Sequence, residues 1–147
     1  MLHFEDFAVD QVYELGSHEL TEDEVLDFAR QFDPQPFHLD RVAAERSVFG
    51  GLVASGWHSA AIFMRLYVDE VLGRAASMGS PGVEELRWFV PVRPGDVVSG
   101  RVRILETSPS SLRADRGTVI AFCELLNQRA EVAMSFRARG FFGRRTE

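Results

Sequence analysis

The chain has 147 residues, with 16 basic and 22 acidic side chains and a formal net charge of −6 at pH 7. This length suits one domain with an adequate core, and the acidic balance with scattered arginines argues against nucleic acid as a partner. None of the basic residues is lysine, so Schiff-base chemistry is excluded, and the single cysteine, Cys123, excludes an internal disulfide.

The first ten residues, 1–10, are acidic and contain no apolar run, so no signal peptide is expected. The longest apolar stretch, residues 52–72, is interrupted by Arg65, Asp69 and Glu70, and a membrane span is therefore not expected either. Together these features predict a cytoplasmic protein that does not associate with membranes and forms a single domain over its whole length.

A helix is predicted to begin at Thr21, because Thr21 followed by Glu24 is typical of a capping box. Apolar residues then recur at helical spacing and are expected to form the buried face of this helix. These residues are Val25, Phe28, Ala29 and Phe32.

Two prolines, Pro34 and Pro36, are expected to end the helix, since each lacks an amide donor and restricts the residue before it. Asp33 and Gln35 are therefore predicted to be extended, and the segment up to His38 is predicted to be a stiff, non-helical arm. An acid and an imidazole, Asp33 and His38, would thus be held in a fixed relation, as proton-transfer catalysis requires.

Other interpretations of this pair remain open. Aspartate before proline is a common helix end, and a loop histidine often only makes a structural hydrogen bond. A metal site would need Asp33, His38, Asp40 and His58 to converge, but the sequence has no His-x-His, HExxH or Cys–His ligand spacing. Nucleotide-binding and serine-hydrolase signatures are also missing, so we expect no metal and no bound cofactor.

A glycine pair, Gly50-Gly51, precedes the apolar run of residues 52–72, which is predicted to form one buried helix about 30 Å long. Gly56 would let a substrate approach the backbone closely, and free amides in the first turn of a helix attract developing negative charge. The backbone amides of Gly51 and Gly56 are therefore candidates for an oxyanion site. Alternatively, these glycines serve only tight turns and close packing, without any role in binding.

Four strands are predicted in the second half of the chain, at residues 83–90, 97–105, 118–126 and 132–139. The third is nearly continuous apolar sequence and is expected to be central in a sheet, with Cys123 as a buried structural thiol. Residues 127–129 are typical of a hairpin turn. A buried helix followed by antiparallel strands predicts an α+β fold in which a curved sheet wraps around the helix.

The loop D-P-Q-P-F-H-L-D at residues 33–40, with F-G-G-L-V-A-S-G-W-H at 49–58, resembles the MaoC-like dehydratases of the (R)-specific enoyl-CoA hydratase group. The segment 86–96 and the turn at 127–129 are similar to that family as well, so the resemblance covers nearly the whole chain. The chain departs from the family at Gln35, where the best-known members carry asparagine. It also departs at Phe37, which is bulkier than the usual aliphatic residue.

The resemblance implies a hotdog fold and the reversible addition of water to a trans-2-enoyl thioester of fatty acid metabolism, which gives an (R)-3-hydroxyacyl thioester. Asp33 and His38 would be the acid–base pair, coenzyme A would enter only as part of the acyl-CoA substrate, and no metal or redox cofactor would be needed. The residues expected to line the substrate pocket are Gln35, Phe37, Ser55 and Trp57.

Hotdog proteins of this kind pair into dimers with pockets between the subunits, so the resemblance implies a homodimer or a multiple of dimers. Two alternatives share the fold: an acyl-CoA thioesterase, and a non-catalytic acyl-thioester-binding subunit of a heterodimer. The presence of both Asp33 and His38 favours the hydratase over either alternative. The acidic chain mildly disfavours acyl carrier protein as the thioester carrier, although a local arginine patch would reverse that preference.

Overall fold

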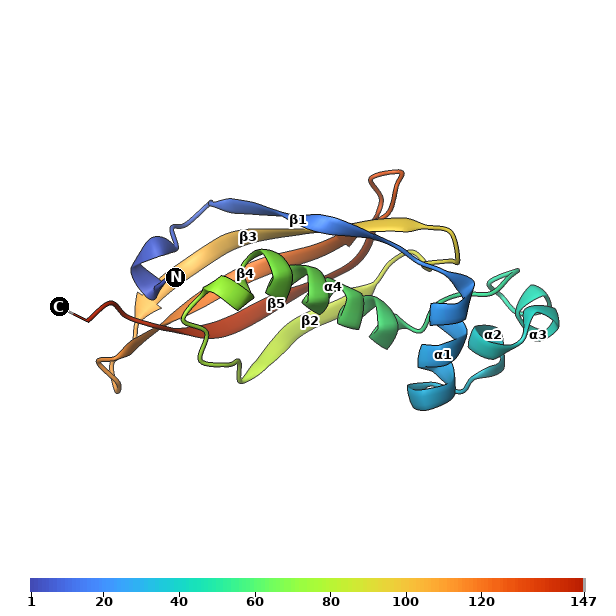
Figure 1. The fold of residues 1–147 in the computed structure, drawn as a ribbon, viewed down its shortest axis with the longest axis horizontal. Coiled ribbons are helices and arrows are strands. Elements are labelled where there is room, and N and C mark those ends of the chain that lie inside the picture. The colour runs from blue at the N-terminus through green and yellow to red at the C-terminus, as the bar shows by residue number, and fades with distance from the viewer. Residues whose placement is uncertain (147) are drawn as a thin grey trace.

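The computed structural model describes residues 1–146 and contains a five-stranded antiparallel sheet with one long helix lying across it (Figure 1). The strands are β1 (Val12–Glu19), β2 (Gly82–Trp88), β3 (Val97–Pro109), β4 (Arg116–Leu126) and β5 (Val132–Gly143). Their order is β1-β3-β4-β5-β2, so β4 is central, as its apolar sequence predicted. The expected α+β hotdog arrangement is confirmed.

The helices are η1 (Phe4–Asp6), α1 (Glu22–Phe32), α2 (Pro36–Leu39), α3 (Arg41–Glu45), α4 (Gly56–Glu70) and η2 (Leu72–Arg74). Helices α1 to α3 gather beyond one end of the sheet, next to the start of α4, and both chain termini lie at the opposite end (Figure 1). No helix within residues 1–146 is long and apolar enough to cross a membrane.

The start of α1 is as predicted. The Thr21 side chain accepts a hydrogen bond from the Glu24 amide, and the Glu24 carboxylate accepts one from the Thr21 amide, which completes the capping box. The predicted burial of Phe32 is wrong, because its side chain is 70% exposed. Phe32 ends α1 beyond the sheet, where its ring packs on Phe28 at 5.1 Å between ring centroids.

The loop after α1 is only partly extended. Gln35 is extended, with φ −88° and ψ 146°, and Asp33 lies outside the helical region, with φ −151°. The prediction of a non-helical arm up to His38 is wrong, because α2 begins at Pro36. Proline fits the first position of a helix, since its missing amide would have no partner there and its φ angle is already helical.

The long helix is shorter than predicted, because residues 52–55 are not helical and α4 begins only at Gly56. Two amides of this segment bond to other parts of the chain: Val53 N donates to Phe37 O at 3.3 Å, and Ala54 N donates to Val92 O at 2.8 Å. The side chain of Ser55 then accepts a hydrogen bond from the Trp57 amide and caps the helix.

The sheet has one strand that the sequence did not predict. In β1 only Leu15 is buried, and the register with β3 shifts between Glu14 and Ser17, so no regular alternation marks this strand. The hairpin turn at residues 127–129 is confirmed, with Ala130 N donating to Asn127 O at 3.0 Å.

The core lies between α4 and the inner face of the sheet. Phe63 of α4 is fully buried, and its ring contacts Phe136 edge-on at 5.2 Å and Tyr67 at 5.8 Å between centroids. Cys123 of β4 is a buried free thiol, as predicted, and burial raises its pKa far above the ordinary value. The opposite side of α4 is exposed at Trp57, Met64 and Val68, so the prediction of a buried helix is wrong on that side.

We expect Phe63→Ala to lower the free energy of unfolding by about 3–5 kcal/mol, because it leaves a cavity at the centre of the core. Leu112→Ala is the control, since Leu112 is 91% exposed and its loss should change stability by no more than about 0.5 kcal/mol. Urea denaturation of both variants measures the difference, and equal stabilities would contradict this account of the core.

Candidate active site

Asp33 and His38 lie side by side at the end of α1 and within α2. The Asp33 amide caps α1 by donating to Ala29 O at 2.9 Å, and His38 N donates to Gln35 O at 3.0 Å, which folds the chain back on itself. As a result His38 Nε2 lies 3.2 Å from Asp33 Oδ2, with the two side chains only 7% and 16% exposed. The structure therefore brings the predicted acid and imidazole together.

The ring of His38 is oriented by the backbone of the segment before α4. Its Nδ1 lies 2.7 Å from the carbonyl oxygen of Val53. A carbonyl only accepts hydrogen bonds, so Nδ1 carries the hydrogen, and in the neutral ring Nε2 is left with its lone pair. Nε2 and the Asp33 carboxylate are then two neighbouring acceptors, an arrangement that suits a water molecule donating to both.

The Asp33 carboxylate is held by its neighbours. Burial raises its pKa, but hydrogen bonds from the Gln35 amide and the Ser55 hydroxyl lower it, as do the charge and hydrogen bond of His38 when that ring is protonated, and the pKa lies below its usual value. The bond from Gln35 Nε2 to Asp33 Oδ1 measures 2.7 Å. Asp33 is therefore ionised at neutral pH, and its other oxygen, Oδ2, faces His38.

The pair borders a cavity of about 420 Å³. Besides Asp33 and His38, the residues that line it include Gln35, Phe37, Phe49, Gly56, Trp57, Trp88, Phe89, Val90, Pro91 and Val92. A mostly apolar wall with a few polar groups is typical of a small-molecule site. Of the predicted pocket residues, Gln35, Phe37 and Trp57 line this cavity, whereas Ser55 is buried behind it, beside Asp33.

Gly56 lies in the cavity wall as the first residue of α4. No hydrogen bond within residues 1–146 uses its amide as a donor, so this group is available at the positive end of the helix. Its carbonyl accepts a 2.9 Å hydrogen bond from Trp88 Nε1. A Cβ at this position would lie 2.5 Å from the Trp88 ring, so glycine is required for the close packing.

Gly51, the other glycine predicted for the oxyanion site, does not line the cavity. It lies in a bend before the non-helical residues 52–55, and a Cβ added there would be 3.2 Å from Arg93 Nη1. The prediction placed Gly51 next to the start of the helix, but this non-helical segment separates it from α4. Gly56 alone is in the predicted place.

Asp40 and His58 do not join the pair. Asp40 caps α3, its carboxylate accepting a hydrogen bond from Val42 N at 2.9 Å. His58 stacks on Phe28 at 4.6 Å between centroids and lines a different pocket, with His18 and Glu24. Over residues 1–146 the structure contains no group of three or more histidine, cysteine, aspartate or glutamate residues placed to hold a metal ion.

The sequence analysis missed several aromatic wall residues: Phe49, Trp88 and Phe89. Phe49 packs on Phe37 at 5.2 Å between centroids, and Trp88 packs edge-on against Trp57 at 5.2 Å. The available signal was the run Trp88-Phe89-Val90-Pro91, in which a proline stops the strand and leaves the aromatic residues at the end of the sheet.

Residues 6–119 match the family model described as MaoC like domain. The chain belongs to this family. The crystal structure of the MaoC-like dehydratase from Rhodospirillum rubrum is similar over 100% of both chains, with 43% sequence identity and a TM-score of 0.94. The resemblance carried by residues 33–40 and 49–58 is thus confirmed at the level of the family.

Two further relatives of this MaoC-like protein have names that state an enzymatic activity. The 3-hydroxybutyryl-CoA dehydratase of Methylorubrum extorquens is 32% identical over 119 residues, which cover 78% of this chain and 71% of that protein. The structure of the (R)-hydratase from A. caviae is 25% identical, with a TM-score of 0.71 over 91% of this chain and 96% of that one.

We expect Gly56→Ala to displace the Trp88 ring and so to shift the tryptophan fluorescence emission. Gly16→Ala is the control, because a Cβ there would meet only Leu66, at an ordinary 3.9 Å. Emission spectra and near-ultraviolet circular dichroism of both variants make the comparison. An unchanged spectrum for Gly56→Ala would show that Trp88 does not pack on this residue.

Proposed function

We propose that this protein catalyses the reversible hydration of trans-2-enoyl thioesters of coenzyme A to (R)-3-hydroxyacyl thioesters, a reaction of fatty acid metabolism. The observation that carries the proposal is the contact of His38 Nε2 with Asp33 Oδ2 at 3.2 Å beside an apolar cavity. The similarity to a 3-hydroxybutyryl-CoA dehydratase and to an (R)-hydratase supports the same reaction class.

In this mechanism a water molecule donates one hydrogen bond to Asp33 Oδ2 and one to His38 Nε2, which aims its lone pair at the β-carbon. His38 accepts the proton as the carbon–oxygen bond forms, because its Nε2 has a free lone pair and the lowered pKa makes Asp33 the weaker base. The neighbouring carboxylate stabilises the imidazolium, which then delivers a proton to the α-carbon. Elimination of water follows the same steps in reverse.

As water adds to the β-carbon, negative charge develops on the oxygen of the thioester carbonyl. We assign the unpaired Gly56 amide at the start of α4 as the donor to this oxygen, because Gly56 lines the same cavity as the pair. A preorganised donor of this kind contributes about 3 kcal/mol to transition-state stabilisation. Trp88 Nε1 donates to the Gly56 carbonyl, which belongs to the next peptide, and so holds the first turn of α4 in place after this amide.

We expect Asp33→Asn and His38→Ala each to lower kcat/KM for crotonyl-CoA hydration by about 10²–10⁴-fold, because each removes one of the two groups that hold the water. Loss of the enoyl absorbance in the ultraviolet measures the rate. Asp27→Asn on the same helix is the matched control, since within residues 1–146 the Asp27 carboxylate pairs with Arg30 alone, at the surface. Wild-type rates in Asp33→Asn would end the proposed mechanism.

The same assay separates the alternatives. Release of free thiol with wild-type protein would indicate a thioesterase instead, whereas binding without turnover would indicate a non-catalytic subunit.

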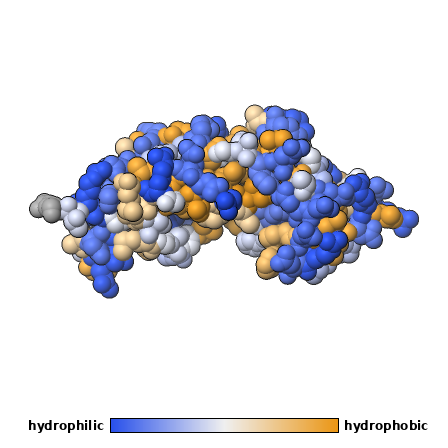
Figure 2. All heavy atoms as spheres, in the orientation of Figure 1, coloured by the Kyte–Doolittle hydropathy of each residue, from blue (hydrophilic) through white to orange (hydrophobic). Residues whose placement is uncertain are grey.

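We also propose that the protein is a homodimer, because one surface carries several exposed apolar side chains. On α4 and around β2 these are Trp57, Met64, Val68, Val83, Trp88 and Phe89. Figure 2 shows hydrophobic residues at the surface in the region of α4. Strand β2 is also an edge strand, whose unpaired backbone groups are available to a partner. A second copy packed here would cover Trp57 and Trp88 and thereby close the cavity.

Light scattering is expected to give about twice the chain mass of 16.5 kDa. Val83→Lys on β2 should shift the protein towards monomer, because it places a charge in the proposed interface. Val12→Lys is the control, since Val12 is similarly exposed but lies on β1, the other edge of the sheet. A wild-type monomer, or dissociation by Val12→Lys alone, would refute this interface.

A further inference from the structure

We propose that Arg93 is a positioning residue for substrate binding, which fixes the Phe49 wall of the cavity. The inference rests on the proposed function, since it assigns the cavity to an acyl thioester. It gives a role to two motifs that the reaction itself does not use, namely Arg93-Pro94-Gly95-Asp96 and the turn at residues 127–129.

A continuous set of contacts leads from Arg93 to the acid–base pair. Arg93 Nη2 donates a 2.6 Å hydrogen bond to the carbonyl of Phe49. The Phe49 ring packs on Phe37, and the Phe37 ring packs edge-on against His38 at 4.6 Å between centroids. The guanidinium therefore determines the position of an aromatic wall that touches the imidazole.

The loop that carries Phe49 has little else to hold it. Its neighbour Val48 is 96% exposed, and Gly50 has a positive φ of 66°. Local hydrogen bonds from Gly50 N to Ser47 O and from Phe49 N to the Ser47 side chain close the turn but do not connect it to the segment between β2 and β3. The Arg93 side chain provides that connection.

The backbone of Arg93 follows directly on a second part of the cavity wall. Residues 90–92 line the cavity and lead into Arg93, and Val92 O accepts the hydrogen bond from Ala54 N. Arg93 thus connects two parts of the wall, one as its neighbour in the chain and the other through its guanidinium. Removing the guanidinium should free the Phe49 wall and leave the other wall in place.

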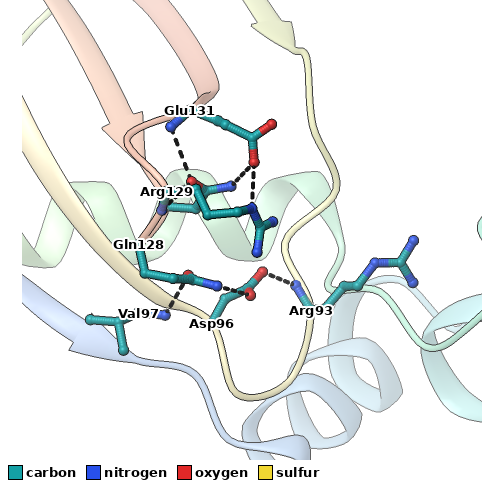
Figure 3. A network of polar contacts seen from close by, with 7 residues as sticks. Arg93, Asp96, Val97, Gln128, Arg129 and Glu131 are labelled. Carbon is teal, nitrogen blue, oxygen red and sulfur yellow. Dashed lines mark hydrogen bonds and ion pairs between the residues drawn. The ribbon is translucent and has the colours of Figure 1, made fainter.

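A polar network holds the main chain of Arg93 (Figure 3). The buried carboxylate of Asp96 accepts hydrogen bonds from Arg93 N at 2.8 Å and from Gln128 Nε2 at 2.9 Å. Gln128 in turn accepts a hydrogen bond from Val97 N at 3.1 Å. The Arg93 guanidinium points away from Asp96 in Figure 3 and forms no ion pair within residues 1–146, so it is free to bond a carbonyl.

Arg93→Met is expected to raise KM for crotonyl-CoA about tenfold and to change kcat much less. The substrate would have to order the released wall on binding, which weakens affinity. The acid–base pair itself keeps its bonds to Val53 O and Gln35, so the chemical step is preserved. A general loss of structure would instead lower kcat and the melting temperature together.

The test is a double-mutant cycle with Arg93→Met and Phe49→Ala. If Arg93 acts through Phe49, each single variant raises KM, and the double variant raises it no further than the larger single effect. Arg65→Met is the matched control and should leave KM unchanged, since within residues 1–146 the Arg65 side chain pairs with Asp69 alone, on the exposed side of α4. An unchanged KM in Arg93→Met, or effects that multiply in the double variant, would overturn the inference.

A binding measurement separates this inference from the proposed function. Both tryptophans of the chain, Trp57 and Trp88, line the cavity, so quenching of their fluorescence by butyryl-CoA reports the Kd without turnover. If wild type does not hydrate crotonyl-CoA, the proposed function fails, and the same double-mutant cycle, measured as Kd for butyryl-CoA, still tests Arg93.

If Arg93→Met does not fold, Arg93→Lys takes its place in the cycle. It should give an intermediate rise in KM or Kd, because an ammonium lacks the planar fork of the guanidinium.

Discussion

The hydrogen bond from His38 Nδ1 to the carbonyl of Val53 is the constraint on which the site depends. It fixes the tautomer of the imidazole and ties α2 to the segment before α4, while Val53 N donates back to Phe37 O. These bonds hold residues 52–55 outside the helix, and α4 begins at Gly56. The closeness of Asp33 and His38 and the free amide of Gly56 are therefore two results of the same backbone arrangement, which explains why they border one cavity.

Much of the fold could be predicted because the relevant signals are local. The capping box of Thr21 and Glu24 needs only residues within one helical turn, and two prolines end a helix wherever they occur. The apolar sequence of β4 likewise predicted its central place, since a strand with neighbours on both edges has no exposed residue and buries every second one. The closeness of Asp33 and His38 also follows from a short turn within the chain.

The parts that could not be predicted depend on partners far away in sequence. Strand β1 has a register shift and only one buried residue, and it is a strand because β3 lies beside it. The start of α4 was misplaced because residues 52–55 have the composition of a buried helix, whereas their amides bond to Phe37 O and Val92 O, which are distant in sequence. Gly51 was assigned to the oxyanion site through the same error, whereas Gly56 lines the cavity and packs against the indole of Trp88.

The two departures from the family pattern lie directly beside the acid–base pair. The amide of Gln35 reaches Asp33 Oδ1 at 2.7 Å, which occupies one carboxylate oxygen and leaves Oδ2 to face His38. The aromatic ring at Phe37 packs against the imidazole and against Phe49, where an aliphatic side chain would present less surface. Both residues touch the pair without replacing either of its groups. Such changes keep both groups of the proposed proton chemistry in place and alter the shape of the wall that meets the acyl chain. We therefore expect them to affect which thioester binds more than which reaction follows.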